Sequence, residues 1–405
     1  MINVYLSNLN TALKLLKCTK CGKTHDPDKV NTVCTSCSGV LYAEYDVEVA
    51  KEYVSPEVLS KRPRTLGLWK YIELLPVKKA ENIVSLGEGA TPLLKARRLG
   101  ELLELKNLYI KDESLNPTGT FKARGIAVAL SKAVELGIKK VGMPSAGNAG
   151  AALAAYAARA GIEAWIYAPK ETPKAMIAEI KLYGAKLELV EGSIADAGRE
   201  LAKVKEREGI FDMTTMKEPY RVEGKKTMGY EIVEDLGWVV PDVVIYPTGG
   251  GTGLLGIWKG IAELKEVGLL KEEKSPRMVT VQSSGCAPVV KAFHEGREVV
   301  EAWPNPKTIA AGIRVPKPYA DYLILKVLRE SGGTAITVED DEIITAVKEL
   351  SRTEGLLPCP EGAATLAALH KLVDQGLIDK DEVVVLVNTG TGLKYIDVLT
   401  QVIKF

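Results

Sequence analysis

The sequence has 405 residues, of which 46% are hydrophobic and 26% charged, and its formal net charge is +1. This composition is typical of a globular protein, and a charge so close to zero argues against nucleic acid or an anionic membrane as a partner. No apolar run reaches the roughly 18 residues that a membrane span needs, and the N-terminus lacks a signal-peptide layout, so we expect a cytoplasmic protein. The length predicts two or three domains.

Four of the six cysteines lie near the N-terminus in two closely spaced pairs. Cys18, Cys21, Cys34 and Cys37 form the pattern C-x2-C-x12-C-x2-C. Each pair can present two thiolates from one tight turn, and two such turns complete a tetrahedral zinc site. Disulfides or inert thiols are the alternative, which a reducing cytosol disfavours. We therefore expect residues 1–45 to be a zinc-ribbon-like element with a structural zinc ion, and we interpret His25 as a surface histidine that is at most a substitute ligand.

After a stretch at about 45–82 that we interpret as a polar connection, short apolar runs alternate with longer amphipathic ones. The helix predicted at 122–137 has an apolar face spaced i, i+3, i+4, i+7. Strands are predicted at 107–113, 139–145, 163–169, 185–192, 277–282 and near the starts of 241–253 and 382–392, and further helices at 149–161, 172–184, 193–208 and 254–266. This alternation predicts α/β architecture with largely parallel sheets.

Ligands of open α/β sheets bind at the carboxyl ends of the strands, so the loops after the predicted strands are informative. The loop PSAGNAG at 144–150 opens a helix with backbone N–H groups, a hydroxyl and an amide, although an ordinary turn has the same pattern. The loop TGGGTG at 248–253 has consecutive glycines whose unobstructed N–H groups suit a phosphate. NTGTG at 388–392 ends the last strand with hydroxyls and little bulk.

The second of these loops also contains the pattern GxGxxG, at Gly251, Gly253 and Gly256. That pattern is typical of dinucleotide binding when an acidic residue follows about 20 positions later, at the end of the next strand. The next predicted strand ends at Gln282 instead, so a single phosphate fits the loop better than a dinucleotide does.

Lys122 stands between the turn-like stretch NPTGTF and a predicted helix. A solvated helix start is the ordinary interpretation of such a lysine. Lysine also forms a Schiff base with carbonyl cofactors, and pyridoxal phosphate (PLP) carries both an aldehyde and a phosphate. The phosphate-binding loop and the lysine together favour PLP.

At this point the sequence resembles the fold-type II PLP enzymes, the tryptophan synthase β-like superfamily, and within it the threonine synthases. The motifs that carry the resemblance are SLGEGATPLL, KDESLNPTGTFKARG, PSAGNAG, EPYRVEGKKTMGYEI, YPTGGGTGLLG, CPEGAATLAAL and NTGTGLKY, which occur in the family's order over residues 80–400. The resemblance implies two open, largely parallel, doubly wound α/β domains. We expect a large PLP-binding domain at 46–110 and 221–405, and a small domain at 111–220 that carries the lysine.

The resemblance also implies roles for individual residues. Lys122 would be the Schiff-base lysine and proton carrier. Asn148 would contact the 3′ oxygen of the cofactor, and Thr389 would contact its pyridine nitrogen. The phosphate of the cofactor would be bound by Gly249, Gly250, Gly251, Thr252 and Gly253. The substrate carboxylate would be bound by Thr91, Ser145, Ala146 and Gly147, and a substrate phosphate by Arg221, for which a surface arginine at a helix start is the alternative.

The implied reaction converts O-phospho-L-homoserine and water to L-threonine and phosphate, in a homodimer, which is the family's usual state. Ala123 and Thr391 depart from the commoner threonine synthase pattern, and the glycine run resembles the loop of amino-acid dehydratases. A serine/threonine dehydratase or a β-replacement synthase acting on an amino acid such as phosphoserine is therefore the second hypothesis. A non-catalytic or nucleotide-binding relative is the third, and Lys122 argues against it.

Overall fold

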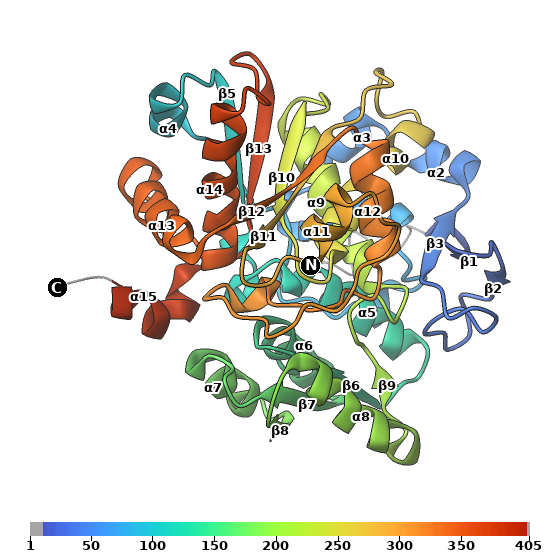
Figure 1. The fold of residues 1–405 in the computed structure, drawn as a ribbon. Helices are drawn as coiled ribbons and strands as arrows, with labels where there is room; N and C mark the ends of the chain where they lie inside the picture. The colour runs from blue at the N-terminus through green and yellow to red at the C-terminus, as the bar shows by residue number, and fades with distance from the viewer. Residues whose placement is uncertain (1–10, 403–405) are drawn as a thin grey trace. The chain divides into compact units, whose positions relative to one another are not determined.

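The computed structural model describes residues 11–402, which divide into two compact units (Figure 1). The first unit comprises residues 11–90, 122–229 and 262–271, and the second comprises 91–121, 230–261 and 272–402. Two helices, α9 (Arg221–Asp235) and α10 (Thr252–Glu266), begin in one unit and end in the other. No helix within 11–402 has both the length and the apolar character needed to cross a membrane.

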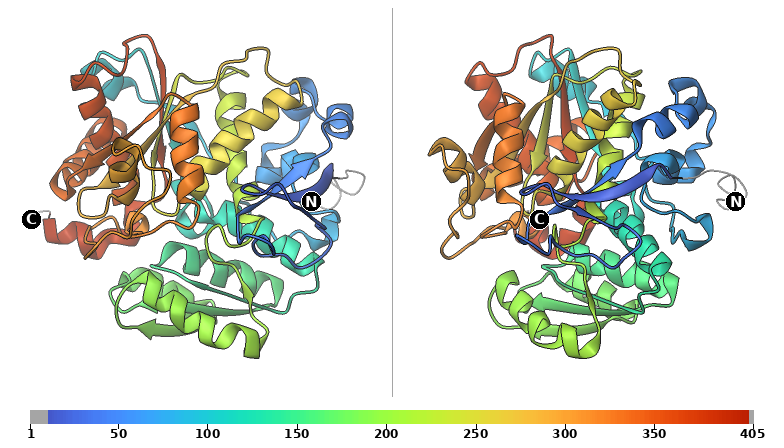
Figure 2. Two further views of the ribbon diagram at one scale, coloured as in Figure 1. Left: turned by 45° about the vertical axis from the view of Figure 1, so that its right-hand side comes forward. Right: turned by 90° about the vertical axis from the view of Figure 1, so that its right-hand side faces the viewer.

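The first unit contains a four-stranded parallel sheet with the order β8-β7-β6-β9. The strands are β6 (Lys140–Pro144), β7 (Glu163–Pro169), β8 (Lys186–Val190) and β9 (Phe211–Asp212), and the helices between them are α6 (Asn148–Ala160), α7 (Lys174–Leu182) and α8 (Ile194–Glu208). Helices α6 and α8 pack on β6 and β7, which lie side by side in both views of Figure 2.

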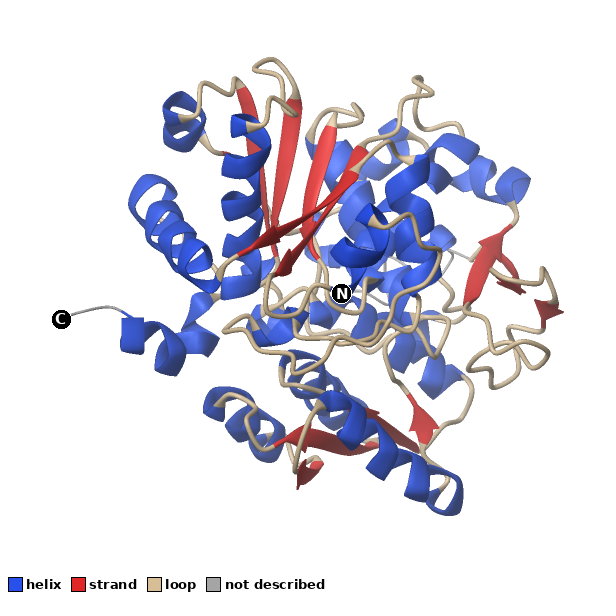
Figure 3. Ribbon diagram, in the orientation of Figure 1, coloured by secondary structure: helices blue, strands red, loops and turns tan. Residues whose placement is uncertain are grey.

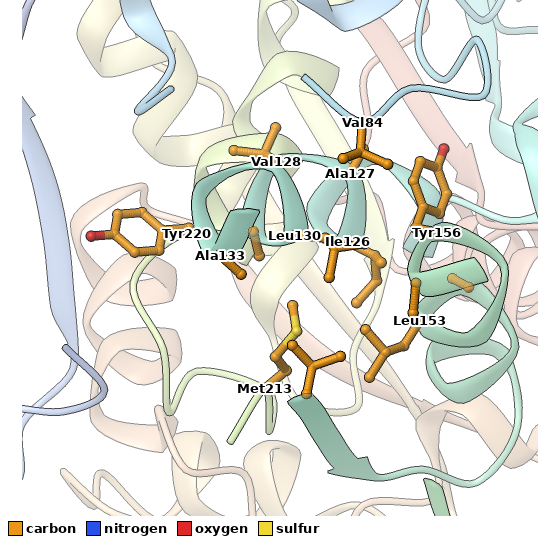
Figure 4. Packing of buried hydrophobic residues seen from close by; sticks show 14 of the residues in the cluster. Val84, Ile126, Ala127, Val128, Leu130, Ala133, Leu153, Tyr156, Met213 and Tyr220 are labelled. Atoms are coloured by element: carbon orange, nitrogen blue, oxygen red, sulfur yellow. The ribbon is translucent and has the colours of Figure 1, made fainter. Parts of the chain in front are cut away.

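Helix α5 (Lys122–Glu135) packs against α6 in the core of the first unit. Ile126 and Leu130 of α5 and Leu153 of α6 are fully buried, together with Met213. Figure 4 shows these side chains pointing toward one another. The predicted apolar face of α5 is therefore a core face, and it fixes the first turn of α5, where Lys122 lies.

The N-terminal part of the first unit begins with a small antiparallel sheet of order β2-β1-β3. Its strands are β1 (Leu13–Cys18), β2 (Thr24–His25) and β3 (Leu41–Tyr45). The helices α2 (Val47–Tyr53), α3 (Pro56–Lys61), η1 (Arg64–Leu74) and η2 (Ala80–Asn82) follow. Residues 1–10 of the predicted zinc-ribbon-like element lie outside the described residues.

The interpretation of 45–82 as a polar connection is wrong for its second half. Leu68, Trp69 and Leu75 are fully buried there. The charges that suggest a solvated segment are neutralised in the interior, because Glu73 is buried and forms an ion pair of 2.6 Å with Arg62. The 3-10 helix η1 also lacks the 3.6-residue period by which a buried helix is recognised in a sequence.

The second unit contains a six-stranded mixed sheet with the order β12-β11-β10-β13-β5-β4 (Figure 3). The strands are β4 (Leu93–Lys95), β5 (Asn107–Asp112), β10 (Val243–Pro247), β11 (Arg277–Ser283), β12 (Thr334–Val338) and β13 (Val383–Asn388). All neighbours are parallel except the edge pair β4 and β5. Strands β5 and β13 pair although they are far apart in the sequence, with Asn107 opposite Val383.

The second unit contains further helices, several of which pack on this sheet. They are α4 (Arg97–Leu102), η3 (Glu113–Leu115), η4 (Pro117–Gly119), α11 (Pro288–His294), η5 (Ala311–Ile313), α12 (Asp321–Glu330), α13 (Asp340–Glu354), α14 (Pro360–Asp374), η6 (Gly392–Tyr395) and α15 (Ile396–Val402). Helix α14 packs on β10 and β13. Every strand and helix predicted between 107 and 392 is present, and the prediction of an α/β fold with largely parallel sheets is confirmed.

Candidate active site

The loop between β10 and α10 in the second unit has glycines at positions where no side chain fits. A Cβ atom added to Gly249 would lie 2.8 Å from the carbonyl oxygen of Gly312. One added to Gly251, whose φ is +79°, would lie 2.3 Å from Cδ1 of Ile324. Glycine is therefore required at both positions, because the loop packs closely against Gly312 and Ile324.

Chemically, the start of α10 is suited to an anion. The first N–H groups of a helix have no acceptor within the helix, and the helix dipole favours negative charge there. The hydroxyl Oγ1 of Thr252, the first residue of α10, is buried and has no hydrogen-bond partner among residues 11–402. Bare glycine backbone, free helix N–H groups and an unpaired hydroxyl fit the phosphate of PLP.

Thr389 follows β13 and is tied to the segment that leads to Lys122. Its carbonyl oxygen accepts a hydrogen bond of 3.0 Å from the N–H of Phe121, and the N–H of Thr391 donates to the carbonyl of Gly119 at 3.0 Å. A further bridge joins Thr120 to Gly390. The stretch NPTGTF therefore runs along NTGTG within the second unit, and Lys122 is the next residue in the chain.

Cys359, at the start of the motif CPEGAATLAAL, contacts the side chain of Thr389. Its Sγ lies 3.4 Å from Oγ1 of Thr389 and accepts a hydrogen bond of 3.3 Å from the N–H of Gly362. Burial holds the pKa of the Cys359 thiol well above its usual value, so this side chain stays neutral. A lone cysteine in CPEGAA gives no sequence signal for such a contact.

Lys122 is the first residue of α5 in the first unit and is half-buried. The start of α9 is packed tightly against this end of α5, because a Cβ atom on Gly224 would lie 2.1 Å from the carbonyl oxygen of Arg124. The guanidinium of Arg124 also donates to Oγ1 of Thr227 at 3.0 Å. The glycines of FKARG and VEGKK thus allow two helices to approach at the backbone and hold the lysine's turn in place.

The loop between β6 and α6, also in the first unit, supplies an acceptor for two of its own N–H groups. Oγ of Ser145 accepts hydrogen bonds from the N–H groups of Gly147 at 3.2 Å and Gly150 at 2.8 Å. Gly147 has a φ of +131°, and a Cβ there would lie 2.0 Å from the sulfur of Met176. Asn148 and Ala146 are half-buried in the same loop. Ser145, Ala146, Gly147 and Asn148 are therefore neighbours.

Arg221 is the first residue of α9 and is 2% exposed, so the alternative of a surface arginine is wrong. Its Nη1 donates to the carbonyl of Met213 at 2.7 Å and to Oγ1 of Thr215 at 3.1 Å. Burial raises the pKa of the neighbouring Glu218 to about 7, although that carboxyl accepts hydrogen bonds from the N–H groups of Tyr220 and Arg221. Arg221 therefore lies among buried polar groups in the first unit.

Thr91 lies in the second unit beside buried charges that sequence reasoning missed. Its hydroxyl donates to Oε1 of Glu113 at 2.6 Å, and its carbonyl accepts from Nζ of Lys111 at 2.7 Å. Lys111 is fully buried in β5 and pairs with Glu231 at 2.8 Å. The lysine in the apolar run NLYIKDE was the available signal, because a charge inside a central strand requires a buried partner.

The four N-terminal cysteines converge in the first unit. Their sulfur atoms all lie within 4.8 Å of one another, and the six cysteines of residues 11–402 form no disulfide. Burial alone would raise the pKa of Cys34, but hydrogen bonds from the N–H of Ser36 and from His25 outweigh it and lower that pKa to about 5. Hydrogen bonding to Cys18 raises the pKa of Cys37 to about 12. Four thiols this close cannot all ionise without a cation, which is the chemistry of a metal site.

The predicted site residues divide between the two units. The first unit contains Lys122, Ser145, Ala146, Gly147, Asn148 and Arg221. The second unit contains Thr91, Gly249, Gly250, Gly251, Thr252, Gly253 and Thr389. Within the second unit, the ring of Phe121 lies 6.0 Å from that of Tyr246 at the end of β10, which places the Thr389 segment near the glycine-rich loop.

Comparisons with known proteins identify the relatives of this chain. Residues 84–390 match the family model described as pyridoxal-phosphate dependent enzyme. The chain is 41% identical to the threonine synthase of Methanocaldococcus jannaschii over 94% of this chain and 93% of that protein. It is 40% identical to the threonine synthase of Methanosarcina acetivorans, over 94% and 92% of the two chains.

Solved structures share the fold. The processed threonine deaminase isoform 2 from Solanum lycopersicum matches with a TM-score of 0.67 and 21% identity, over 84% of this chain and 94% of that one. Maize serine racemase matches with a TM-score of 0.64 and 22% identity, over 77% and 92%. The chain belongs to the pyridoxal-phosphate-dependent enzymes of fold type II and, within them, to the threonine synthase family.

Proposed function

We propose that this enzyme is a threonine synthase that converts O-phospho-L-homoserine and water to L-threonine and phosphate. The observation that carries the proposal is the 40–41% identity to threonine synthases over 94% of the chain, because it extends across both units and both groups of site residues. When bound, PLP supplies an electron sink that makes the Cα proton of an amino acid acidic. The chain's own residues must then hold the substrate and move its protons.

We assign the proton transfers to Lys122. Its position at the first turn of α5 is fixed by the α5–α9 contact and by the hydrogen bonds of the preceding segment. An amine held in one place can take a proton from Cα and return protons at neighbouring carbons. Cofactor contacts are assigned to Asn148, Thr389 and the loop 249–253.

We assign the substrate's phosphate to Arg221 and its carboxylate to Thr91, Ser145, Ala146 and Gly147. A guanidinium binds phosphate in a fork geometry, and Nε of Arg221 is buried with no hydrogen-bond partner among residues 11–402. The hydroxyl of Thr91 already donates its proton to Glu113. Thr91 would therefore bind the substrate's carboxylate through its backbone N–H. In the loop 144–150, the N–H groups of Gly147 and Gly150 already donate to Ser145. The substrate's carboxylate would be bound by the other backbone N–H groups of this loop.

The activity is tested by supplying phosphohomoserine and measuring phosphate and threonine in the same reaction. We expect equal amounts of both products, and no keto acid from serine or threonine. Lys122→Ala should abolish this activity. Lys139→Ala changes an exposed lysine, so it is the matched control and should retain full activity. Keto acid released from serine or threonine while phosphohomoserine stays inert would favour the dehydratase hypothesis, which the glycine run supports.

The phosphate role of Arg221 has its own test. Arg221→Ala should raise KM for phosphohomoserine by about tenfold or more, because a charge-assisted hydrogen bond is lost, while the affinity for PLP stays unchanged. Thr215→Val removes a contact of the guanidinium but leaves its charge in place, and is the matched control. An unchanged KM in Arg221→Ala would contradict the assignment.

Other features of the family enter as parts of this proposal. We propose that the four clustered cysteines bind a structural zinc ion in a zinc-ribbon-like element, because four sulfur ligands leave no open coordination position for catalysis. A cytoplasmic homodimer and a division into a large domain (46–110 and 221–405) and a small domain (111–220) remain predictions. Analytical ultracentrifugation and metal analysis of the purified protein test the dimer and the zinc.

A further inference from the structure

The phenol of Tyr246 lies beside the glycine-rich loop, and the proposed function does not use it. Tyr246 lies in β10 just before the loop and is 2% exposed. Its hydroxyl has no hydrogen-bond partner among the described residues 11–402. A buried hydroxyl without a partner destabilises a protein, so such a group is expected to serve a ligand or a function.

The position of this hydroxyl is fixed against the first turn of α10. A Cβ atom added to Gly253 would lie 1.8 Å from the Tyr246 oxygen, so the phenol occupies the space that a side chain at 253 would fill. Phe121 packs edge-on against the tyrosine ring, at 6.0 Å and an angle of 80°. The N–H of Phe121 is in turn bound to Thr389, so the ring has a rigid support.

A second unpaired hydroxyl lies in the same turn. Thr252 precedes Gly253 in α10, a helix of 15 residues, and its buried Oγ1 also has no partner among residues 11–402. The first turn of α10 therefore carries one unpaired hydroxyl on Thr252 and has a second, that of Tyr246, beside Gly253. Burial raises the pKa of Tyr246 well above its usual value, so the phenol remains a hydrogen-bond donor at neutral pH.

We propose that Tyr246 is a cofactor-binding residue whose phenol donates a hydrogen bond to the phosphate of PLP at the start of α10. The inference rests on the proposed function only in taking PLP as the cofactor, and it is independent of the substrate. Neither the glycine pattern nor the resemblance to known enzymes points to this tyrosine. It would add a neutral donor to the N–H groups that the start of the helix supplies.

The test measures cofactor binding without any substrate. Tyr246→Phe keeps the ring and removes the hydroxyl. We expect its dissociation constant for PLP to rise about tenfold to a hundredfold, the effect of losing a hydrogen bond to a charged group. Its affinity for pyridoxal, which has no phosphate, should equal that of the wild type. Tyr156→Phe is the matched control, because Tyr156 is a buried tyrosine whose hydroxyl is already bound to Glu88, and it should lose no phosphate-specific affinity.

The outcomes separate this inference from the proposed function. Equal PLP affinity in Tyr246→Phe and wild type, or an equal loss for PLP and pyridoxal, would overturn the role of Tyr246. A wild-type protein that takes up no PLP would instead contradict the proposed function. If Tyr246→Phe does not fold, 3-fluorotyrosine placed at 246 keeps the test open: its fluorine NMR signal should move on addition of PLP and not of pyridoxal, and a signal that responds alike to both would overturn the proposal.

Discussion

Two loops of this enzyme look alike in the sequence and differ in their hydrogen bonding. Residues 144–150 and 247–253 each connect a parallel strand to a helix, and each is rich in small residues. In the first loop, Oγ of Ser145 already accepts the N–H groups of Gly147 and Gly150. In the second, the hydroxyl of Thr252 is buried and has no partner among residues 11–402. The first loop therefore supplies an acceptor for two of its own N–H groups, and the second holds a buried hydroxyl that a ligand could engage.

The difference shows what makes a glycine-rich turn a phosphate site. Glycine gives access to the backbone in both loops, so it does not distinguish them. What distinguishes them is the use of the hydroxyl, because that of Ser145 accepts N–H groups of its own loop and that of Thr252 has no partner among residues 11–402. We therefore expect the Ser145 hydroxyl to contribute mainly to stability and shape, and the Thr252 hydroxyl to contribute mainly to cofactor affinity.

The largest effect is expected at Lys122, which lies in neither loop. Lys122→Ala should reduce turnover by about 10³-fold or more, since both covalent attachment and proton transfer are lost. The loop at 247–253 should still hold PLP without a covalent bond. Absorbance spectra should therefore lose the visible band of lysine-bound cofactor that borohydride abolishes in the wild type, while dialysis retains some PLP. Complete loss of PLP binding would show that the second loop is not an independent phosphate site.

A smaller loss of turnover is expected from crowding the second loop. Gly253→Ala places a methyl group 1.8 Å from the phenol oxygen of Tyr246, so the phenol or the start of α10 must move. Overpacking of this kind costs about 1–3 kcal/mol of unfolding free energy, and we expect PLP affinity to fall with it. Denaturant unfolding and PLP titration measure the two effects.

Gly198→Ala is the matched control for that change. Gly198 lies inside α8, and an added Cβ would make only ordinary contacts with Pro144, the nearest at 3.7 Å. Alanine is favoured over glycine in a helix, so this variant should gain about 0.5–1 kcal/mol. Equal behaviour of the two alanine variants would remove the steric argument for the second loop.

The two hydroxyls give the most direct test of the comparison. Ser145→Ala leaves two N–H groups without their acceptor and should lower the unfolding free energy by about 1–2 kcal/mol, with or without PLP. Thr252→Val removes a hydroxyl that has no protein partner, so the protein without cofactor should not lose stability. Its PLP affinity should fall about tenfold. Thermal unfolding at several PLP concentrations separates the two cases, and the reverse pattern would overturn the comparison.

The smallest effect on turnover is expected from the cluster of four cysteines, whose thiols converge as they would around a metal ion. Removing zinc with a chelator should lower the unfolding temperature but change turnover by no more than about twofold, because a site with four sulfur ligands is structural. Cys34→Ser should lose the metal, whereas Cys286→Ser, a change of a buried cysteine outside the cluster, should retain it. Zinc bound equally by both variants would exclude the cluster as the metal site.

Much of the fold was predictable because local patterns determine it. The strands β5, β6, β7 and β10 and the helices α5, α6 and α8 all lie where apolar periodicity predicts them. The burial of the segment at 64–75 was not predictable, since its 3-10 helix lacks the 3.6-residue period and its charged Glu73 is neutralised by Arg62 only in the folded chain. The same limit applies to Lys111, whose partner Glu231 is 120 positions away.

The sequence by itself determined the alternation of strands and helices, the two cysteine pairs, Lys122 and the loops after the strands. These follow from residue types and short spacings. Only the tertiary structure decided which N–H groups and hydroxyls are satisfied. It placed Ser145 under its own loop, buried Arg221, brought Cys359 to Thr389 and left the phenol of Tyr246 beside Gly253. The physical reason is that a hydrogen bond requires two groups within about 3 Å, and the partner is set by long-range packing rather than by neighbours in the chain.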